Sequence, residues 1–306
     1  MLPALVRRLL GGVGVLLAVS VATFALSFLL PADPARMIAG PSASVATVNS
    51  IRHELGLDRP LVARYGEYLF KLLHADLGRS FKQNVEVTTL VASRFPATFL
   101  LMLAGIFFEL LLGVPAGIAA ALRPGTWLDR FVMSLSFLGV SAPQFVLGLG
   151  LLYFLAFRWP LFPLGGSGTV AHIILPAFTL GVGGAGWYAR LVRSSLLDVL
   201  GQDYVRTAAA KGALPRVVVG KHALKNALLP LITMIGLDIG TFMGGVIVVE
   251  SVFGWPGLGK LTWDAIRVVD IPVIMGVVQV SAVMIVLGNL LADFLYPLVD
   301  PQVRFA

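Results

Sequence analysis

The amino-acid sequence predicts an all-α integral membrane protein with six transmembrane helices. Of its 306 residues, 58% are hydrophobic and only 13% are charged, and the mean hydropathy is +0.90. Soluble domains carry about 25% charged residues. Several apolar runs are also long enough to cross a bilayer, which takes about 20 helical residues. Composition and run length together place the chain in a membrane.

The first predicted span covers residues 9–30 and follows two basic residues, Arg7 and Arg8. A secretory signal peptide opens in the same way, but its apolar run is shorter and ends at a cleavage site of small residues. Here the run ends in Pro31-Ala32-Asp33-Pro34. We therefore expect residues 1–30 to form a cytoplasmic N-terminus and a first transmembrane helix.

The one sizeable polar segment covers residues 31–94. Apolar residues recur at helical spacing over 45–55 and 61–73, with an interruption at 56–60. We expect this segment to be an extracytoplasmic insert, which covers the outer rim or packs near a partner. Residues 95–306 then form a core domain with five further transmembrane helices.

Five apolar runs predict those remaining helices. The first of the five contains Gly113 and Gly117, a pair of small residues that lets helices approach closely. The second is interrupted near its centre by Ser141-Ala142-Pro143-Gln144. The five runs are residues 97–122, 131–157, 172–192, 228–249 and 272–297.

Positive charge predicts the orientation, because short cytoplasmic loops collect Lys and Arg. The short loops on the other side hold only Arg158, Lys260 and Arg267. Both termini are therefore expected in the cytoplasm. The basic residues assigned to the cytoplasmic side are Arg7, Arg8, Arg123, Arg130, Arg190, Arg193, Arg206, Lys211, Arg216, Lys221, Lys225 and Arg304.

A polar, basic stretch at residues 202–230 lies between the fourth and fifth runs. Strong helix formers predict a short helix over residues 204–211, and Gly212 follows, as glycine often does just past a helix end. An exposed helix with small side chains suits docking into a groove on a partner. An ordinary basic cytoplasmic loop would have the same composition, so the residues alone leave both interpretations open.

This stretch resembles the EAA loop of ABC importer permeases, which presents a coupling helix to an ATPase subunit. Arg206-Thr207-Ala208 stands where the family has Glu-Ala-Ala, Gly212 is in place, and Leu224-Lys225 stands where the family has Leu-Pro. The residues of this stretch are similar to those of one branch of the family, the permeases for oligopeptides, dipeptides, glutathione and nickel. Further phrases that resemble this branch occupy residues 30–34, 55–61, 76–80, 94–98 and 252–259.

The resemblance covers nearly the whole chain and implies the type I ABC importer permease fold, with the coupling loop at residues 202–227. It implies a second permease subunit, two ATPase subunits or domains and an extracytoplasmic binding protein, in a bacterial or archaeal plasma (inner) membrane. ATP and magnesium would be bound by the ATPase partners, with no cofactor in this chain. The residues carried over as ATPase-coupling are Asp203, Tyr204, Arg206, Thr207, Ala208, Ala209, Lys211 and Gly212.

Ionisable groups inside spans are functional candidates, because burying them in hydrocarbon is costly. Asp238 lies among glycines, and it either meets a cationic group of the cargo or pairs with an Arg or the backbone of a neighbouring helix. Glu109 and Gln144 are further candidates for the translocation pathway, each with a structural alternative. Glu250 sits near a span end, where snorkelling to the interface explains it.

Several kinds of chemistry are not expected. The chain has no Cys, and its four His are scattered without metal-ligand spacing, so no metal site is predicted. Residues 254–260 match the Gly-x4-Gly-Lys part of a phosphate-binding loop, but Leu261 follows where Ser or Thr is needed to hold magnesium. No nucleophile with its base is evident, so we predict no catalytic residue. The positive net charge of +7 fits cytoplasmic loops better than nucleic acid.

The cargo predicted from these phrases is a peptide: a dipeptide, an oligopeptide or a glutathione-like molecule. Permeases for nickel or a metal chelate carry very similar phrases and are the alternative. A stand-alone secondary transporter is an alternative of another class, although such proteins usually show internal repeats and none is evident here.

Overall fold

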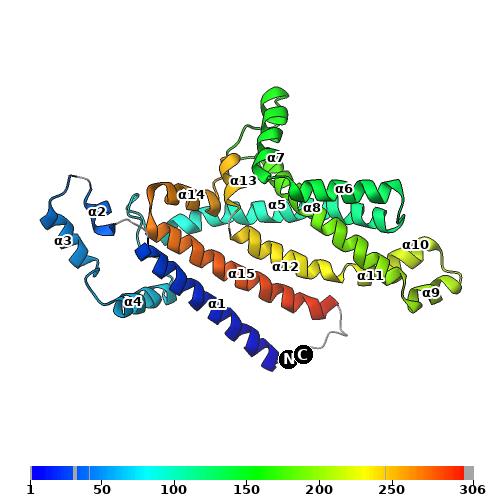
Figure 1. Cartoon of the computed structure of the whole chain (residues 1–306), viewed down its shortest axis with the longest axis horizontal. Coiled ribbons are helices and arrows are strands. Elements are labelled where there is room, and N and C mark those ends of the chain that lie inside the picture. The colour runs from blue at the N-terminus through cyan, green and yellow to red at the C-terminus, as the bar shows by residue number, and fades with distance from the viewer. Residues whose placement is uncertain (1, 30–32, 41, 245, 300–306) are drawn as a thin grey trace.

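A computed structural model describes residues 2–29, 33–40, 42–244 and 246–299, and all regular elements in these ranges are helices (Figure 1). Residues 300–306, which include Arg304, and residues 30–32 and Gly245 lie outside the described residues. The all-α expectation is therefore confirmed over the described part of the chain.

Four helices in the described ranges are long and apolar enough to cross a membrane. The first of the predicted spans corresponds to α1, and α15 corresponds to the last. The α5 helix begins ten residues before the predicted start at residue 97 and continues through Pro96. The four helices are α1 (Leu2–Leu29), α5 (Val87–Ala121), α8 (Val170–Leu200) and α15 (Ile271–Val299).

Two bent helix pairs bring the possible number of crossings to six. The first pair is α6 (Trp127–Ser141) followed by α7 (Gln144–Leu151) and the π-helix η1 (Leu152–Arg158), with a bend of 98°. The predicted interruption at Pro143 is confirmed, because Pro143 precedes α7 and α6 ends at Ser141. A 15-residue helix such as α6 is only about 22 Å long, less than the hydrocarbon thickness of about 30 Å.

The second bent pair replaces the single helix predicted over residues 228–249, and that prediction is wrong in its bounds. α12 (Leu229–Met243) ends before Gly244, and a separate helix, α13 (Ile247–Val252), follows. On its other side α12 continues from a helical segment bent by 43° relative to it. This segment comprises α10 (Pro215–Val217), η2 (Val218–Ala223) and α11 (Leu224–Ala227). Glu250 lies in α13 and accepts a hydrogen bond from the Lys260 amide of α14 (Leu258–Val268).

Glycines let α5, α6 and α8 pack with their backbones in close contact. A Cβ atom at Gly113 would come within 2.6 Å of the Ala185 carbonyl oxygen, and one at Gly117 would meet Ala189 and Val192. Gly186 of α8 faces the Ser136 carbonyl of α6 in the same way. The predicted close approach is therefore confirmed for the Gly113 pair. We call these three helices the α5–α6–α8 block.

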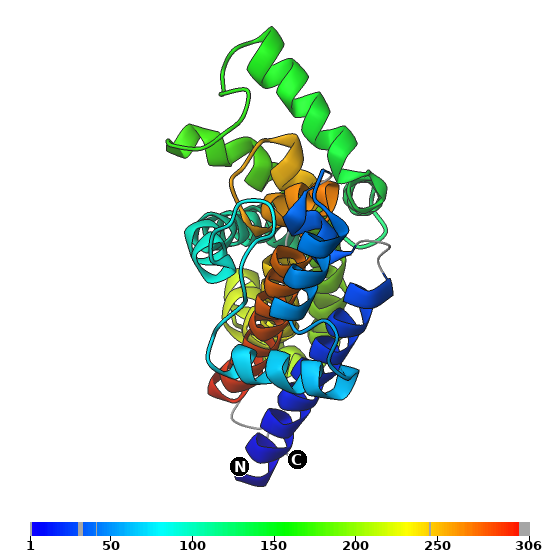
Figure 2. The same cartoon turned by 90° about the vertical axis from the view of Figure 1, so that its left-hand side faces the viewer.

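The remaining long helices lie beside this block. α15 packs on α12 and on α1 (Figures 1 and 2). The segment before α5 forms three short helices, α2 (Pro34–Ala39), α3 (Val45–Glu54) and α4 (Leu61–Leu73), at one end of the molecule. The opposite end carries α9 (Asp203–Ala210) and α10, and we call it the α9 end (Figure 1).

Two polar contacts join the short helices and their loop to the long ones. The Tyr65 hydroxyl of α4 lies 2.9 Å from the Ser20 hydroxyl of α1. The buried Asp270 carboxylate, at the start of α15, accepts hydrogen bonds from the Ser80 hydroxyl at 2.5 Å and from the Phe81 amide at 3.1 Å. The phrase at residues 76–80 is thereby attached to the long helices.

Candidate functional site

The helix predicted at residues 204–211 is present as α9 and projects at one end of the molecule (Figure 1). Asp203 lies in its first turn, where a negative charge favours the helix dipole. Gly212 follows with φ +84°, a left-handed conformation that glycine adopts without penalty. Its amide donates to the Ala209 carbonyl at 3.0 Å and so ends the helix.

One face of α9 is anchored and the rest is open. Val205 is 3% exposed and is the buried contact of the helix. The Asn226 amide of α11 donates a 2.8 Å hydrogen bond to the Tyr204 hydroxyl, so α9 is also tied to the segment before α12. Ala208 is half-buried. The other predicted coupling residues are exposed: Asp203, Tyr204, Arg206, Thr207, Ala209, Lys211 and Gly212.

α9 contacts η2, and η2 belongs to a small apolar cluster between three elements, which we call the floor. Leu196 of α8 packs with Ala121 of α5 and with Ala223 and Ala227 of the η2–α11 segment. All four are at most 2% exposed. An anchored inner face and an open outer face fit a helix that docks on another protein. Val205, Asn226 and this cluster were not identified from the sequence, since their roles depend on contacts between separate helices.

Two of the three predicted translocation residues meet in a polar junction between α5, α8 and α12. The carboxyl groups of Glu109 and Asp238 lie next to each other. The Tyr188 hydroxyl donates a hydrogen bond to Asp238. A Cβ at Gly184 would collide with the Glu109 carboxylate, so the glycine makes room for it. We call Glu109, Tyr188 and Asp238 the polar junction.

The partners of Asp238 differ from those expected, since they are a tyrosine and a carboxyl group rather than an Arg or the backbone. Asp238 is half-buried, whereas Glu109 is 2% exposed. Gln144 lies at the start of α7, and its side chain contacts α8 beside Gly183. Its role in translocation stays a prediction, as do those of Asp238 and Glu109. Tyr188 could have been suspected only from its position just after the glycine run of residues 181–186.

The segment that matches part of a phosphate-binding loop holds an internal carboxylate instead. Glu250 is fully buried and accepts hydrogen bonds from the Thr98 hydroxyl at 2.7 Å and from the Lys260 amide at 2.8 Å. A Cβ at Gly257 would collide with it, so this glycine leaves space for the carboxylate. Since Glu250 occupies the amides at the start of α14, a phosphate has no place there.

The snorkelling explanation for Glu250 is therefore wrong. Burial raises the pKa of the Glu250 carboxyl, and the hydrogen bonds from Thr98, Lys260 and Gly259 oppose that rise. No local pattern predicts this burial, because Thr98 is 152 residues away along the chain. Among the residues that the structure describes, no group of three His, Asp or Glu side chains could hold a metal ion.

Several apolar helices, a helix exposed at one end and ionisable groups paired inside spans define a multi-pass membrane transport subunit. The family described as "Binding-protein-dependent transport system inner membrane component" matches residues 113–305, and its N-terminal companion, "Binding-prot-dependent transport system membrane comp, N-term", matches residues 1–104. The chain belongs to this family of ABC importer permeases. It is a multi-pass inner membrane protein and not itself an enzyme, since ATP hydrolysis belongs to partner ATPases.

Curated relatives match over the full length. The glutathione transport system permease protein GsiC of Salmonella paratyphi A is 42% identical over 305 residues, which is 100% of both chains. GsiC of Pectobacterium atrosepticum is also 42% identical, and GsiC of Escherichia coli O6:H1 is 40% identical, each over 100% of both chains. The matching family consists of subunits of binding-protein-dependent transport systems. The alternative of a stand-alone secondary transporter is therefore wrong.

The fold is similar to that of a solved importer. A chain of the inward-facing MetNI methionine ABC transporter superposes with a TM-score of 0.59 at 22% identity, covering 69% of this chain and 96% of that one. The type I importer permease fold is therefore confirmed. The exposed helix α9 lies where the EAA loop of the family is expected, and an ATPase and a substrate-binding protein are the partners that such a permease implies.

Proposed function

We propose that this permease imports small peptides of the glutathione type. The observation that carries the proposal is identity of 42% over the whole length of both chains with glutathione permeases. Two glutathione permeases from other bacteria match over 100% of both chains as well. Residues 32–41 resemble glutathione importers, whereas residues 65–69 and 236–240 resemble nickel permeases, so these phrases do not decide between the two cargoes.

The proposed mechanism is alternating access driven from the α9 end. An ATPase would bind the open face of α9, and its closure on ATP would move α9 together with its floor. The cavity would thereby switch between two states, each stabilised by a different set of contacts. ATP and magnesium belong to the ATPase partners in this proposal, and Asp203 to Gly212 receive the motion.

A second permease subunit completes the proposed pathway, which would run between the two subunits. Asp238 is the best candidate of the polar junction to approach the cargo, since it is half-buried while Glu109 is enclosed. A half-exposed carboxylate is a natural partner for the amino group of a peptide. In the membrane the α9 end would face the cytoplasm, and α2 to α4 the outside, as the distribution of Lys and Arg favours.

The cargo is tested by titrating the purified cognate binding protein with glutathione, with dipeptides and with nickel complexes in a calorimeter. We expect saturable binding of glutathione and ATP-dependent uptake of glutathione by vesicles that hold the complete transporter. Tight nickel binding without peptide binding would replace the proposal with the nickel alternative. Uptake of glutathione that needs no ATPase subunit would contradict the mechanism.

A further inference from the structure

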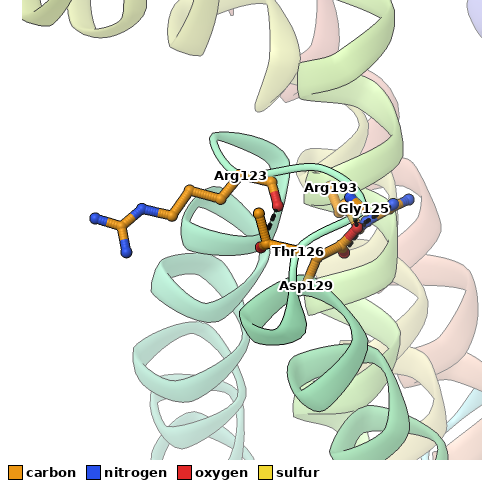
Figure 3. A network of polar contacts seen from close by, with 5 residues as sticks. All are labelled: Arg123, Gly125, Thr126, Asp129 and Arg193. Atoms are coloured by element: carbon orange, nitrogen blue, oxygen red, sulfur yellow. Dashed lines mark hydrogen bonds and ion pairs between the residues drawn. The ribbon is translucent and has the colours of Figure 1, made fainter.

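A partly buried ion pair joins the turn between α5 and α6 to α8 (Figure 3). Asp129, near the start of α6, is 3% exposed. The Arg193 guanidinium of α8 donates to both of its carboxylate oxygens, from Nε at 2.5 Å and from Nη2 at 2.7 Å. The Gly125 amide adds a third hydrogen bond at 2.9 Å. The geometry is that of a bidentate pair, which fixes orientation as well as distance.

The turn itself is ordered by its own contacts. Gly125 has φ +74°, so the chain reverses there without strain. The Thr126 hydroxyl donates to the Arg123 carbonyl at 2.6 Å, and Figure 3 shows this bond beside the ion pair. A stiff turn bonded to one side chain of α8 passes displacement on instead of absorbing it.

The pair lies where the close backbone packing of the block ends. Gly117 contacts Ala189 and Val192 of α8, and Arg193 is the next residue along. Beyond it, the last two turns of α8 lead to Leu200 and then to α9, and Leu196 packs in the floor. The ion pair is thus the polar contact between α6 and the part of α8 that carries α9.

We propose that Asp129 and Arg193 are positioning residues that make α6 follow the coupling helix. When an ATPase displaces α9, the end of α8 moves with it, because only residues 201 and 202 separate the two helices. The ion pair transmits that movement to the α5–α6 turn, so the α5–α6–α8 block moves as one body. Without the pair, α8 would move at its end while α6 lagged behind. This inference rests on the proposed function, because it needs an ATPase that acts on α9.

The test uses the complete transporter in vesicles and measures cargo imported per ATP hydrolysed. For Asp129→Asn we expect this ratio to fall at least about fivefold, the low end of couplings between protein sites, with ATP hydrolysis retained. The exchanged pair D129R/R193D should restore much of the ratio. A matched control is Asp264→Asn, which removes the exposed Lys260–Asp264 pair and should leave the ratio unchanged.

A merely structural role predicts that transport and ATP hydrolysis fall together, and an unchanged ratio would overturn the proposal. If Asp129→Asn does not assemble into the transporter, Arg193→Lys provides the test of the proposal. This substitution keeps the positive charge but loses the bidentate hydrogen bonds to Asp129. That variant should have a lowered ratio, and a normal ratio would overturn the proposal. The ratio can be measured with any cargo, so failure of wild-type glutathione uptake counts against the cargo and not against the ion pair.

Discussion

Glu250 is a fully buried carboxylate, and the groups around it offset the free-energy cost of its desolvation. Removing an ionised carboxylate from water is expensive unless hydrogen bonds replace the lost solvation. Thr98 and the Lys260 amide supply such bonds, and the start of α14 adds the favourable end of a helix dipole. The residue therefore holds α5, α13 and α14 together.

Replacing Glu250 with Gln should destabilise the protein measurably. The Gln amide keeps the size of the side chain but presents a donor where the Thr98 hydroxyl or the Lys260 amide needs an acceptor. Loss of hydrogen bonds to a charged group costs about 1.5–3 kcal/mol each. We expect a clear drop in the melting temperature of the detergent-purified protein. The exposed change Asp264→Asn should alter melting little, and equal melting of the two variants would contradict the structural role of Glu250.

Single residues divide into those that the sequence could identify and those that it could not. Asp238 stood out because an acid inside an apolar run is unusual, and it does sit among paired groups. Glu250 lies at the edge of a run, where an exposed position was the simpler expectation. Its partner Thr98 is on a helix 152 residues earlier, and no local pattern reveals such a pairing. The same holds for Asp129 and Arg193, which are 64 residues apart.

At the scale of elements, α9 followed from the sequence because its determinants are local. The alanines favour a helix and Gly212 ends it, so no distant contact was needed. The bend of 98° after α6 is different. Pro143 signals an interruption, but the angle depends on what α7 packs against. α12 likewise ends at Met243, before Gly244, whereas the apolar run continues to residue 249, so the fifth span was predicted too long.

Gly212 tests the coupling role of α9 through backbone conformation. Its φ of +84° is strained for other residues, by about 1–2 kcal/mol, while a Cβ there would meet no atom within 4 Å. Replacing Gly212 with Val should therefore fray the end of α9 without disturbing the membrane core. We expect ATP-dependent transport to fall several-fold while the protein still inserts and ATP hydrolysis persists.

Gly220 offers the matched control for that experiment. It is also exposed and has no atom within 4 Å of a built Cβ, but its φ is not positive. Gly220→Val should transport nearly as well as the wild type, measured as cargo uptake in the same vesicles. Undiminished transport by Gly212→Val, at equal protein levels, would count against a coupling role for α9.

At the scale of the molecule, two groups of helices meet at an interface that contains the polar junction. The α5–α6–α8 block is held by glycine contacts between backbones, and α12 packs chiefly on α15. Between these groups lies the contact of Glu109, Tyr188 and Asp238. Apolar contacts join the same two groups, because Phe242 of α12 packs with Leu180 of α8 in the main core and Leu231 of α12 packs with Tyr188 of α8. Two of the predicted translocation residues therefore lie within the interface between the two groups.

The number of crossings decides which side of the membrane each end of the molecule faces. From α4 to α9 the chain runs along α5, back along α6 and forward along α8 (Figure 1). If the α6–α7 pair counts as a crossing, α4 and α9 lie on opposite sides. If it does not, two crossings return the chain to the same side. The α6–α7 pair needs this test because α6 has only 15 residues and is followed by a bend of 98°.

Single introduced cysteines can show which side of the membrane each end faces, because the chain contains no cysteine of its own. Val62 of α4 is 85% exposed, and Lys211 just past α9 is exposed as well. With a maleimide that cannot cross membranes, we expect Val62→Cys to react in intact spheroplasts and Lys211→Cys only in inside-out vesicles, since basic loops stay in the cytoplasm. Labelling of both from one side would remove the α6–α7 crossing. Labelling with the two sides exchanged would place α9 out of reach of ATP and end its proposed role.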